Sequence, residues 1–261
     1  MYSNVMVTGG CGFIASNFLN IMKKRYPDTH FVNVDKLDYC SNVQNVEPGV
    51  ATFVKGNVGD VKLIEHLIKQ YKFDAVFHFA AQSHVDNSFG DALSFTMDNT
   101  YATHVLVEAC RQFIPNVEFI HFSTDEVYGE NTTDKPFSEM QMLNPTNPYS
   151  ASKAAAEMML TAYQKFCNFK TFVIRSNNIF GPRQYPEKLI PRSIMRLKKG
   201  LAIELHGSGE NRRSYLHVED FCKAVDSVLK NGRDGHIYNV GSQFEKSNLE
   251  VASTLVKHMG G

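Results

Sequence analysis

The sequence predicts an α/β protein built on a doubly wound parallel sheet. Apolar runs rich in β-branched residues alternate with stretches of helical periodicity along most of the chain. The apolar runs are nearly continuous, as in NVMV and VEFIHF, and do not alternate with polar residues. This is typical of parallel strands that helices cover on both faces.

The individual elements follow in an order that fits this fold. In the first part we expect strands at 4–9, 30–35, 51–57, 73–81, 117–123 and 170–175, and helices at 13–25, 60–71, 93–113 and 148–166. In the second part we expect strands at 202–207, 213–218 and 236–241, a helix at 218–229 and a helix that starts near Ser247. No Gly-, Ser- or Pro-rich linker separates the parts, so we predict that they are interleaved.

The composition is that of an ordinary globular protein. The 261 residues include 27 Lys and Arg against 27 Asp and Glu, so no overall field favours a polyanion such as nucleic acid. No apolar run approaches the roughly 20 residues that a membrane span needs. The five cysteines are scattered without a CxxC pair, which favours neither a metal site nor disulfides. We expect a cytoplasmic protein with reduced thiols that binds neither nucleic acid nor membranes.

A glycine-rich turn follows the first expected strand. In VMVTGGCGFIASNF, glycine at positions 9 and 12 lets the backbone turn sharply and approach a diphosphate at the start of the next helix. Ala15 completes the motif, and Asp35 ends the second strand about twenty residues later, where a carboxylate binds ribose hydroxyls. An acid there repels a 2′-phosphate. The sequence therefore predicts a Rossmann-type site for NAD and disfavours NADP.

Two further strand ends leave room for a dinucleotide. Asn57 and Val58 follow the third strand, and the small residues Ala80 and Ala81 follow the fourth. Each feature alone is common in turns, and together they extend the expected cofactor site.

Tyr149 and Lys153 lie four residues apart in an expected helix, so they share one face. A phenol with a pKa near 10 is a poor base at neutral pH, but an adjacent ammonium stabilises the phenolate. We expect Lys153 to lower the pKa of Tyr149 by about three units, which lets Tyr149 remove the proton of an alcohol as its hydride leaves for NAD.

The segment FSTDEVYGE places a hydroxyl and two carboxylates directly after an apolar strand. The carboxyl ends of parallel strands are where α/β proteins bind ligands. Two adjacent carboxylates repel each other and gain nothing from an apolar neighbourhood, so a chemical use is expected. We predict that Thr124, Asp125 and Glu126 belong to a functional site.

Four motifs occur in one order: TGGCGFIASN, STDEVYG, PYSASK and NNIFGPRQYPEKLIP. Together they resemble the extended short-chain dehydrogenase/reductases, specifically the nucleotide-sugar 4,6-dehydratases. The resemblance implies that Tyr149 is the base on the sugar C4 hydroxyl, helped by Thr124 and Lys153. It implies that Glu126 removes the C5 proton and that Asp125 protonates the departing C6 hydroxyl, with NAD taking and returning a hydride. Acid and base duties on neighbouring carboxylates suit such an elimination.

The resemblance also implies binding residues. NAD contacts are expected from Gly9, Gly12, Phe13, Ile14, Asp35, Lys36, Leu37, Asp38, Asn57, Val58, Ala80, Ala81, Ser83, Tyr149, Lys153 and Asn178. Substrate contacts are expected from His84, Thr124, Asn177, Asn178, Lys188, Leu189, Ile190 and Arg213, with no metal ligands. Packing is an equal alternative for His84, and Lys188 is alternatively a solvated charge. We predict an NAD-binding Rossmann domain at 1–175 and a mainly substrate-binding part at 176–261.

The segments KLDYCSN and AAQSHVDNSFG are more similar to UDP-glucose 4,6-dehydratases, including the first domain of plant rhamnose synthases, than to the dTDP-glucose enzymes. The favoured interpretation is conversion of UDP-glucose to UDP-4-keto-6-deoxyglucose, toward UDP-rhamnose or related deoxysugars. The alternatives are a dTDP-glucose 4,6-dehydratase, an NAD-dependent UDP-sugar 4-epimerase and an inactive nucleotide-sugar binding module.

Three further expectations follow from the resemblance. Asn57 stands where an Asp is usual, so we expect weaker NAD binding because charge assistance is lost. The chain ends at HMGG, earlier than is usual in the family, so we expect a C-terminal truncation that affects activity. A homodimer is expected through the helices at 93–113 and 149–166.

Overall fold

A parallel sheet forms the centre of the molecule. The computed structural model describes residues 2–131, 135–205 and 207–259. Seven strands pair side by side in the order β3-β2-β1-β4-β5-β6-β9, all parallel. They span β1 Asn4–Thr8, β2 His30–Asp35, β3 Thr52–Lys55, β4 Ala75–His78, β5 Glu118–Thr124, β6 Thr171–Ser176 and β9 Ile237–Val240. The predicted doubly wound Rossmann-type sheet is confirmed.

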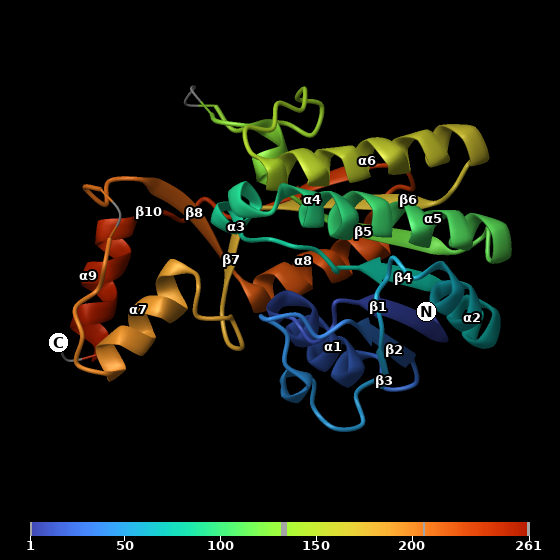
Figure 1. Cartoon of the computed structure of the whole chain (residues 1–261), viewed down its shortest axis with the longest axis horizontal. Helices are drawn as coiled ribbons and strands as arrows, with labels where there is room; N and C mark the ends of the chain where they lie inside the picture. The colour runs from blue at the N-terminus through green and yellow to red at the C-terminus, as the bar shows by residue number, and fades with distance from the viewer. Residues whose placement is uncertain (1, 132–134, 206, 260–261) are drawn as a thin grey trace.

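Helices cover both faces of this sheet (Figure 1). One face packs against α1 (Phe13–Arg25) and α8 (Val218–Asn231), with Phe18 and Phe221 fully buried. The other face packs against α2 (Val61–Tyr71), α5 (Ala102–Phe113) and α6 (Pro148–Cys167). Because each strand is covered twice, its apolar residues form a nearly continuous run.

One of the long helical runs changes its hydrogen-bonding pattern. The short helix α3 spans Val85–Gly90. After it, α4 (Ala92–Phe95), the π-helical segment η2 (Thr96–Tyr101) and α5 follow one another without a loop. Such π segments frequently occur at functional sites. In η2, Asn99 accepts a hydrogen bond from the Gln82 backbone N–H at 2.8 Å and donates to its carbonyl at 3.0 Å.

The second part of the chain contributes a small sheet and two helices beside the main sheet (Figure 1). The small sheet has the order β10-β8-β7, and α7 and α9 pack against each other. Their bounds are β7 Asn178–Phe180, α7 Leu189–Lys198, β8 Arg212–His217, β10 Glu245–Ser247 and α9 Asn248–Met259. Two short 3-10 turns, η1 (Val43–Asn45) and η3 (Asp125–Tyr128), complete the described elements.

The strand expected at 202–207 is wrong for the described residues 202–205, and His206 lies outside the described residues. The alternating apolar side chains Leu201, Ile203 and Leu205 face a groove with α9 residues. The backbone N–H of Leu201 donates to Arg196, and the Ala202 carbonyl accepts from the Arg196 side chain. This segment therefore packs on helices and has no strand partner.

Candidate active site

A cavity of about 710 Å³ opens at the carboxyl ends of the central strands. It is lined by residues of the glycine turn, of the strand ends after β2, β4 and β5, and of the segment from Asn177 to Ile190. All of the predicted catalytic, cofactor and substrate residues line this cavity except Leu37. The structure thus brings together residues that lie up to two hundred positions apart in the sequence.

The glycine turn is shaped for close approach of a ligand. Gly9 has a φ of +71°, and a Cβ there would lie 2.8 Å from backbone atoms of Ala80, so only glycine fits. Gly12 caps α1 without a side-chain acceptor, and Gly12, Phe13 and Ile14 line the cavity. The first N–H groups of a helix lack partners within the helix and bind anions. The turn therefore fits a diphosphate.

Asp35 is held by the backbone at the end of β2. Its Oδ2 accepts from the Cys11 N–H at 2.9 Å, and its Oδ1 accepts from the Leu37 N–H at 2.7 Å. Each carboxylate oxygen has a further lone pair, which leaves acceptors for ribose hydroxyls. Leu37, predicted to contact the cofactor, does not line the cavity. Its backbone has a φ of 62° and orients Asp35.

Next to Asp35, one ammonium and one amide hold two carboxylates. Lys36 Nζ lies 2.9 Å from Asp38 and 2.6 Å from Asp98. The side-chain amide of Gln82 donates to the same two carboxylates, at 2.6 and 2.9 Å. A glutamate at position 82 would add a third carboxylate to this cluster, so the amide is the residue type that the cluster requires.

Asn57 lines the cavity, and its Oδ1 accepts from the Gly59 N–H at 2.8 Å. Val58, Ala80 and Ala81 line the same side. The amide oxygen of Asn57 therefore already accepts one hydrogen bond in a local turn. Its second lone pair is left for one further donor.

Thr124, Asp125 and Glu126 form the junction of β5 and η3. The Thr124 hydroxyl caps η3 by accepting from the Glu126 N–H at 3.2 Å, and it donates to Asp125 Oδ1 at 3.3 Å. The Glu126 Oε2 accepts from the Asn147 side chain at 3.2 Å. Both carboxylates line the cavity, so the local cap fixes the directions in which they point.

The Asp125 carboxyl holds its proton more tightly than a free aspartate does. Burial within the protein and the neighbouring Glu126 charge raise the pKa of Asp125 to about 6, against the opposing effects of the Thr124 hydroxyl and Arg213. The side chain of Asp125 has accessible surface, but this surface faces the cavity, where protein surrounds it. Asp125 is therefore suited to hold a proton near neutral pH and to donate it.

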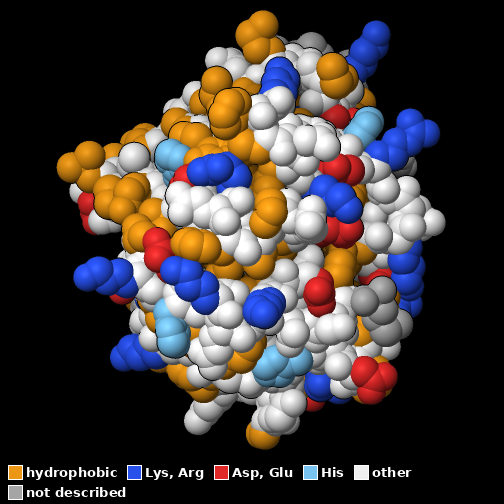
Figure 2. Space-filling view, turned by 90° about the vertical axis from the view of Figure 1, so that its right-hand side faces the viewer, with side chains coloured by type: hydrophobic (Ala, Val, Ile, Leu, Met, Phe, Trp, Pro, Cys, Tyr) orange, Lys and Arg blue, Asp and Glu red, His pale blue; other side chains and the backbone are white. Residues whose placement is uncertain are grey.

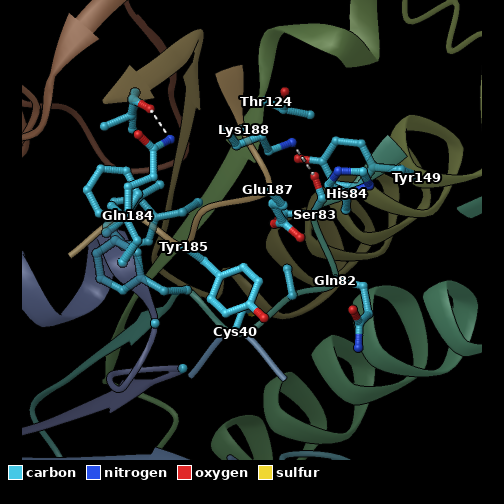
Figure 3. Close-up of a pocket in the computed structure, with 18 of the residues that line it drawn as sticks. Cys40, Gln82, Ser83, His84, Thr124, Tyr149, Gln184, Tyr185, Glu187 and Lys188 are labelled. Carbon is cyan, nitrogen blue, oxygen red and sulfur yellow. Dashed lines mark hydrogen bonds between the residues drawn. The ribbon is translucent and has the colours of Figure 1, made fainter. Parts of the chain in front are cut away.

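Tyr149 and Lys153 begin α6, whose N-terminus is fixed by a capping box at Asn147 and by Pro148 at the first helical position. Both side chains are buried and line the cavity, and Figure 3 shows Tyr149 near Thr124 and His84. Lys153 Nζ donates to the Phe122 carbonyl at 2.7 Å and lies 3.4 Å from His121 Nε2.

The expected low pKa of Tyr149 is wrong for this structure. Burial and the Glu126 and Asp125 charges raise the pKa of Tyr149 well above its usual range, and the Thr124 hydroxyl opposes them only in part. Lys153 cannot offset this, because its ammonium is directed to the Phe122 carbonyl and burial lowers its own pKa to about 8. The spacing of Tyr149 and Lys153 predicts that they share one face of a helix, but it does not predict which way the Lys153 ammonium points.

Unpaired polar atoms point to where a ligand fits. Among the described residues, six buried side-chain atoms have no hydrogen-bond partner, and four of them belong to residues that line the cavity. These are His84 Nδ1, Ser123 Oγ, Asn177 Oδ1 and Gln184 Oε1. Such atoms are costly to bury without a partner, so they favour a polar ligand in the cavity. His84 therefore lines the site, as one of its two alternatives predicted.

The predicted substrate segment contributes Gln184, Tyr185, Glu187 and Lys188 to the lining of the cavity (Figure 3). Lys188 Nζ donates to the Ser83 carbonyl at 3.4 Å, and Asn178, Leu189, Ile190 and Arg213 also line the cavity. The sequence interpretation missed Tyr185 and Glu187, which lie in the same segment. Glu187 accepts from the Tyr39 hydroxyl at 2.8 Å, and the rings of Tyr39 and Tyr185 meet edge to face. Only the tertiary fold brings these two loops together.

The sheet order, the glycine turn and the Tyr149 and Lys153 pair define an extended short-chain dehydrogenase/reductase. The model of the family described as GDP-mannose 4,6 dehydratase matches residues 6–261, and the chain belongs to this family. The resemblance to nucleotide-sugar 4,6-dehydratases is thereby confirmed.

Known relatives carry both candidate nucleotides in their names. A trifunctional UDP-glucose 4,6-dehydratase/UDP-4-keto-6-deoxy-D-glucose 3,5-epimerase/UDP-4-keto-L-rhamnose-reductase of Arabidopsis thaliana is 45% identical over 98% of this chain. The chain spans 40% of the length of that relative. The dTDP-D-glucose 4,6-dehydratase of Mus musculus is also 45% identical, over 97% of this chain and 72% of its own length.

A solved structure agrees with the fold. The dTDP-glucose 4,6-dehydratase DesIV of Streptomyces venezuelae, solved with NAD and TYD bound, has a TM-score of 0.93 and 35% identity. The match covers 99% of this chain and 81% of that one. The predicted cofactor is the one that this neighbour holds.

Proposed function

We propose that the chain is an NAD-dependent nucleotide-sugar 4,6-dehydratase, a hydro-lyase. The observation that supports this most is the joining of Thr124, Asp125 and Glu126 with Tyr149 in one cavity. An oxidoreductase or epimerase needs the tyrosine and threonine but has no use for an adjacent acid and base. A dehydratase needs both, because it must remove a proton and protonate a leaving hydroxyl.

The residues present fit NAD. The free N–H groups at the start of α1 would hold its diphosphate, and Asp35 would accept from a ribose hydroxyl. Lys153 would complete the ribose and nicotinamide end, with Asn57 and Val58 beside the adenine. Bound NAD would supply the acceptor for the C4 hydride and would return that hydride to C6.

The chain's own residues move the protons. Tyr149 takes the proton of the C4 hydroxyl, and Thr124 orients the same oxygen. The positive nicotinamide ring of bound NAD would oppose the Glu126 and Asp125 charges that raise the pKa of Tyr149 in the free protein, and would so favour its phenolate. Once C4 is a ketone, the C5 proton is acidic, and Glu126 removes it. The electron pair of the C5–H bond forms the C5–C6 double bond, the C6–O bond breaks, and Asp125 protonates the departing hydroxyl to give water. Glu126 then returns a proton to C5.

The substrate side leaves two nucleotides to compare. UDP-glucose is our first choice, supported by the Arabidopsis relative and by the similarity of the segments KLDYCSN and AAQSHVDNSFG to UDP-glucose 4,6-dehydratases. dTDP-glucose is the alternative, supported by the Mus musculus relative at the same identity. Arg213 is positioned to bind the substrate diphosphate, for which a guanidinium is well suited.

We also propose a homodimer through α4, η2, α5 and α6. Large apolar side chains are exposed along these helices, with Leu93 at 80% and Phe166 at 86% exposure. Figure 2 shows hydrophobic side chains gathered at the upper left of that view. In Figure 1 these helices lie in the upper half of the molecule, and the turn between the two views keeps the vertical direction. Exposed apolar patches of this kind commonly form protein interfaces.

Among the described residues, no helix is long and apolar enough to cross a membrane.

One assay tests the proposed activity. The purified protein is incubated with NAD and UDP-glucose, and in parallel with dTDP-glucose, and the 4-keto-6-deoxy product is followed by mass and alkaline absorbance. We expect turnover of one sugar nucleotide well above the other, which identifies the nucleotide. Formation of UDP-galactose would instead support an epimerase, and no turnover of either sugar would contradict the proposed activity.

A further inference from the structure

The asparagine that caps α6 also binds a cavity carboxylate. Asn147 Oδ1 accepts from the Ser150 N–H at 2.8 Å, as an N-cap residue does. Because this bond uses the amide oxygen, the amide nitrogen must point away from the helix, and it donates to Glu126 Oε2 at 3.2 Å. One side chain thus joins the start of the helix that bears Tyr149 to the turn that bears Glu126.

The backbone holds the two partners together. The Asn144 N–H donates to the Val127 carbonyl at 2.9 Å, so the loop before α6 runs directly along the η3 turn. Gly129 has a φ of +81°, and a Cβ there would lie 2.3 Å from the Asn144 carbonyl oxygen. The contact between Asn147 and Glu126 is therefore fixed by the packing of the loop before α6 against the η3 turn.

Asparagine is the N-cap residue that suits both tasks. Serine, threonine and aspartate cap helices as well as asparagine does. However, aspartate would place a second negative charge against Glu126, and serine lacks the reach and the N–H donors of an amide. An N–H donor stabilises the ionised carboxylate, and it occupies one of the two oxygens. The other oxygen is left to act on the ligand.

We propose that Asn147 is a positioning residue that holds Glu126 in the orientation needed for proton removal from C5. This inference rests on the proposed dehydratase function. Asn147 does not line the cavity, so any effect on a bound ligand passes through residues that do, such as Glu126 and Tyr149. The structure therefore separates two effects: the cap of α6, which serves Tyr149 and the first step, and the amide donor, which serves Glu126 and the elimination.

Three variants separate these effects. Asn147→Asp keeps the cap and loses the donor, Asn147→Ser keeps a cap oxygen and loses the amide, and Ser150→Ala weakens the capping box without touching Glu126. Each is mixed with NAD and the sugar nucleotide that the wild-type protein turns over. C4 oxidation is followed by NADH absorbance in a single turnover, and C5 proton removal by deuterium uptake from D₂O, measured by mass.

We expect both Asn147 variants to slow deuterium uptake and water loss about 10- to 100-fold, the range for losing a hydrogen bond to a charged group. C4 oxidation should stay within about twofold of wild type, since the cap remains. Ser150→Ala should lower the melting temperature. It should either leave C4 oxidation and C5 proton removal unchanged or slow both by the same factor. If Asn147→Asp leaves deuterium uptake unchanged, or slows oxidation as much as elimination, the inference is wrong.

A second measurement does not depend on turnover. The ¹³C chemical shift of the Glu126 carboxyl is measured in the free protein at one pH, with the wild type and the neutral variant Asn147→Ser compared. The other titratable groups that face this carboxyl are Asp125 on the same turn and Tyr149 on α6, and both are retained. We expect the Glu126 carboxyl signal to move in the variant, because its amide donor is lost, and an identical chemical shift would overturn the inference. A wild-type protein without dehydratase activity would contradict the proposed function alone.

Discussion

Lys153 and Phe122 are joined by a hydrogen bond from the ammonium to the backbone carbonyl, at 2.7 Å. The bond lies inside the protein, because the Lys153 side chain is only 3% exposed. Burial lowers the pKa of Lys153 to about 8, and the charge of Glu157 opposes this only in part. The ammonium on which the active site depends is therefore held at a cost to stability.

This cost predicts a pH-dependent stability difference. The folded state binds the Lys153 proton less tightly than the unfolded state, whose pKa is near 10.4. The penalty is fully present below pH 8, at about 3 kcal/mol, and disappears as the pH rises from 8 to about 10.5. Lys153→Met should therefore be more stable than wild type at pH 7, with the advantage shrinking through this window.

Denaturant unfolding of both proteins from pH 7 to 10.5 measures this difference. The exposed Lys165→Met on the same helix serves as the control, and it should show no such window. If the difference between wild type and Lys153→Met were constant with pH, the ammonium would not titrate as the burial implies.

The titration of Asp125 should depend on the charge of Glu126. The Glu126 charge contributes to raising the pKa of Asp125 to about 6, so Glu126→Gln should lower it toward the usual value. NMR titration of ¹³C-labelled aspartate carboxyls measures this shift. The folded state favours protonated Asp125, so its contribution to stability falls as the pH rises through about 4 to 6 and is smallest above that range. An unchanged Asp125 midpoint in the variant would leave burial alone as the cause.

Glu126→Gln should also divide the reaction. The amide keeps the shape of the side chain but cannot accept the C5 proton, so C4 oxidation proceeds and water loss slows by about 10²- to 10⁴-fold. NADH absorbance and product mass report the two steps. Glu130→Gln, an exposed acid four residues further on, is the matched control and should behave as wild type. If Glu126→Gln dehydrates at the wild-type rate, another group is the C5 base.

The proposed dimer predicts a change in size for one surface variant. Leu93→Glu places a charge in the exposed apolar surface of α4, and we expect it to halve the mass measured by light scattering. Val61→Glu changes another exposed apolar residue, at the start of α2, and should leave the mass unchanged. A wild-type protein that is already monomeric at micromolar concentration would contradict the proposal.

The sequence predicted the first part of the fold closely, because its strands and helices have strong periodicity and the glycine turn has a specific shape. The helix expected at 148–166 ends one residue later, at Cys167. The elements β7, β10, α3 and α7 were not expected, because the two strands are only three residues long and the helices lie within motif segments. At the site, the members of the cavity were predictable, since strand ends meet at one edge of a parallel sheet.

The contacts between members of the site were not predictable in the same way. The direction of Lys153 and the bond between Asn147 and Glu126 depend on which loops pack together. The residues NPYS do show an N-cap followed by Pro and Ser, which is a readable helix start. The side-chain nitrogen of Asn147 binds Glu126, which lies twenty-one residues earlier in the chain, and the helix-start pattern does not show this.

The turn that bears the two carboxylates is also anchored from the other end of the chain. The Tyr128 hydroxyl donates to Asn239 on β9 at 2.6 Å and accepts from Arg175 on β6 at 2.7 Å, and Arg175 pairs with the buried Glu157. A chimaera that exchanged everything after β6 with that of a relative would therefore disturb the acid and base along with the sugar pocket. We therefore expect a new sugar specificity to be introduced into this chain more readily by changing single loops around the cavity than by exchanging one whole half.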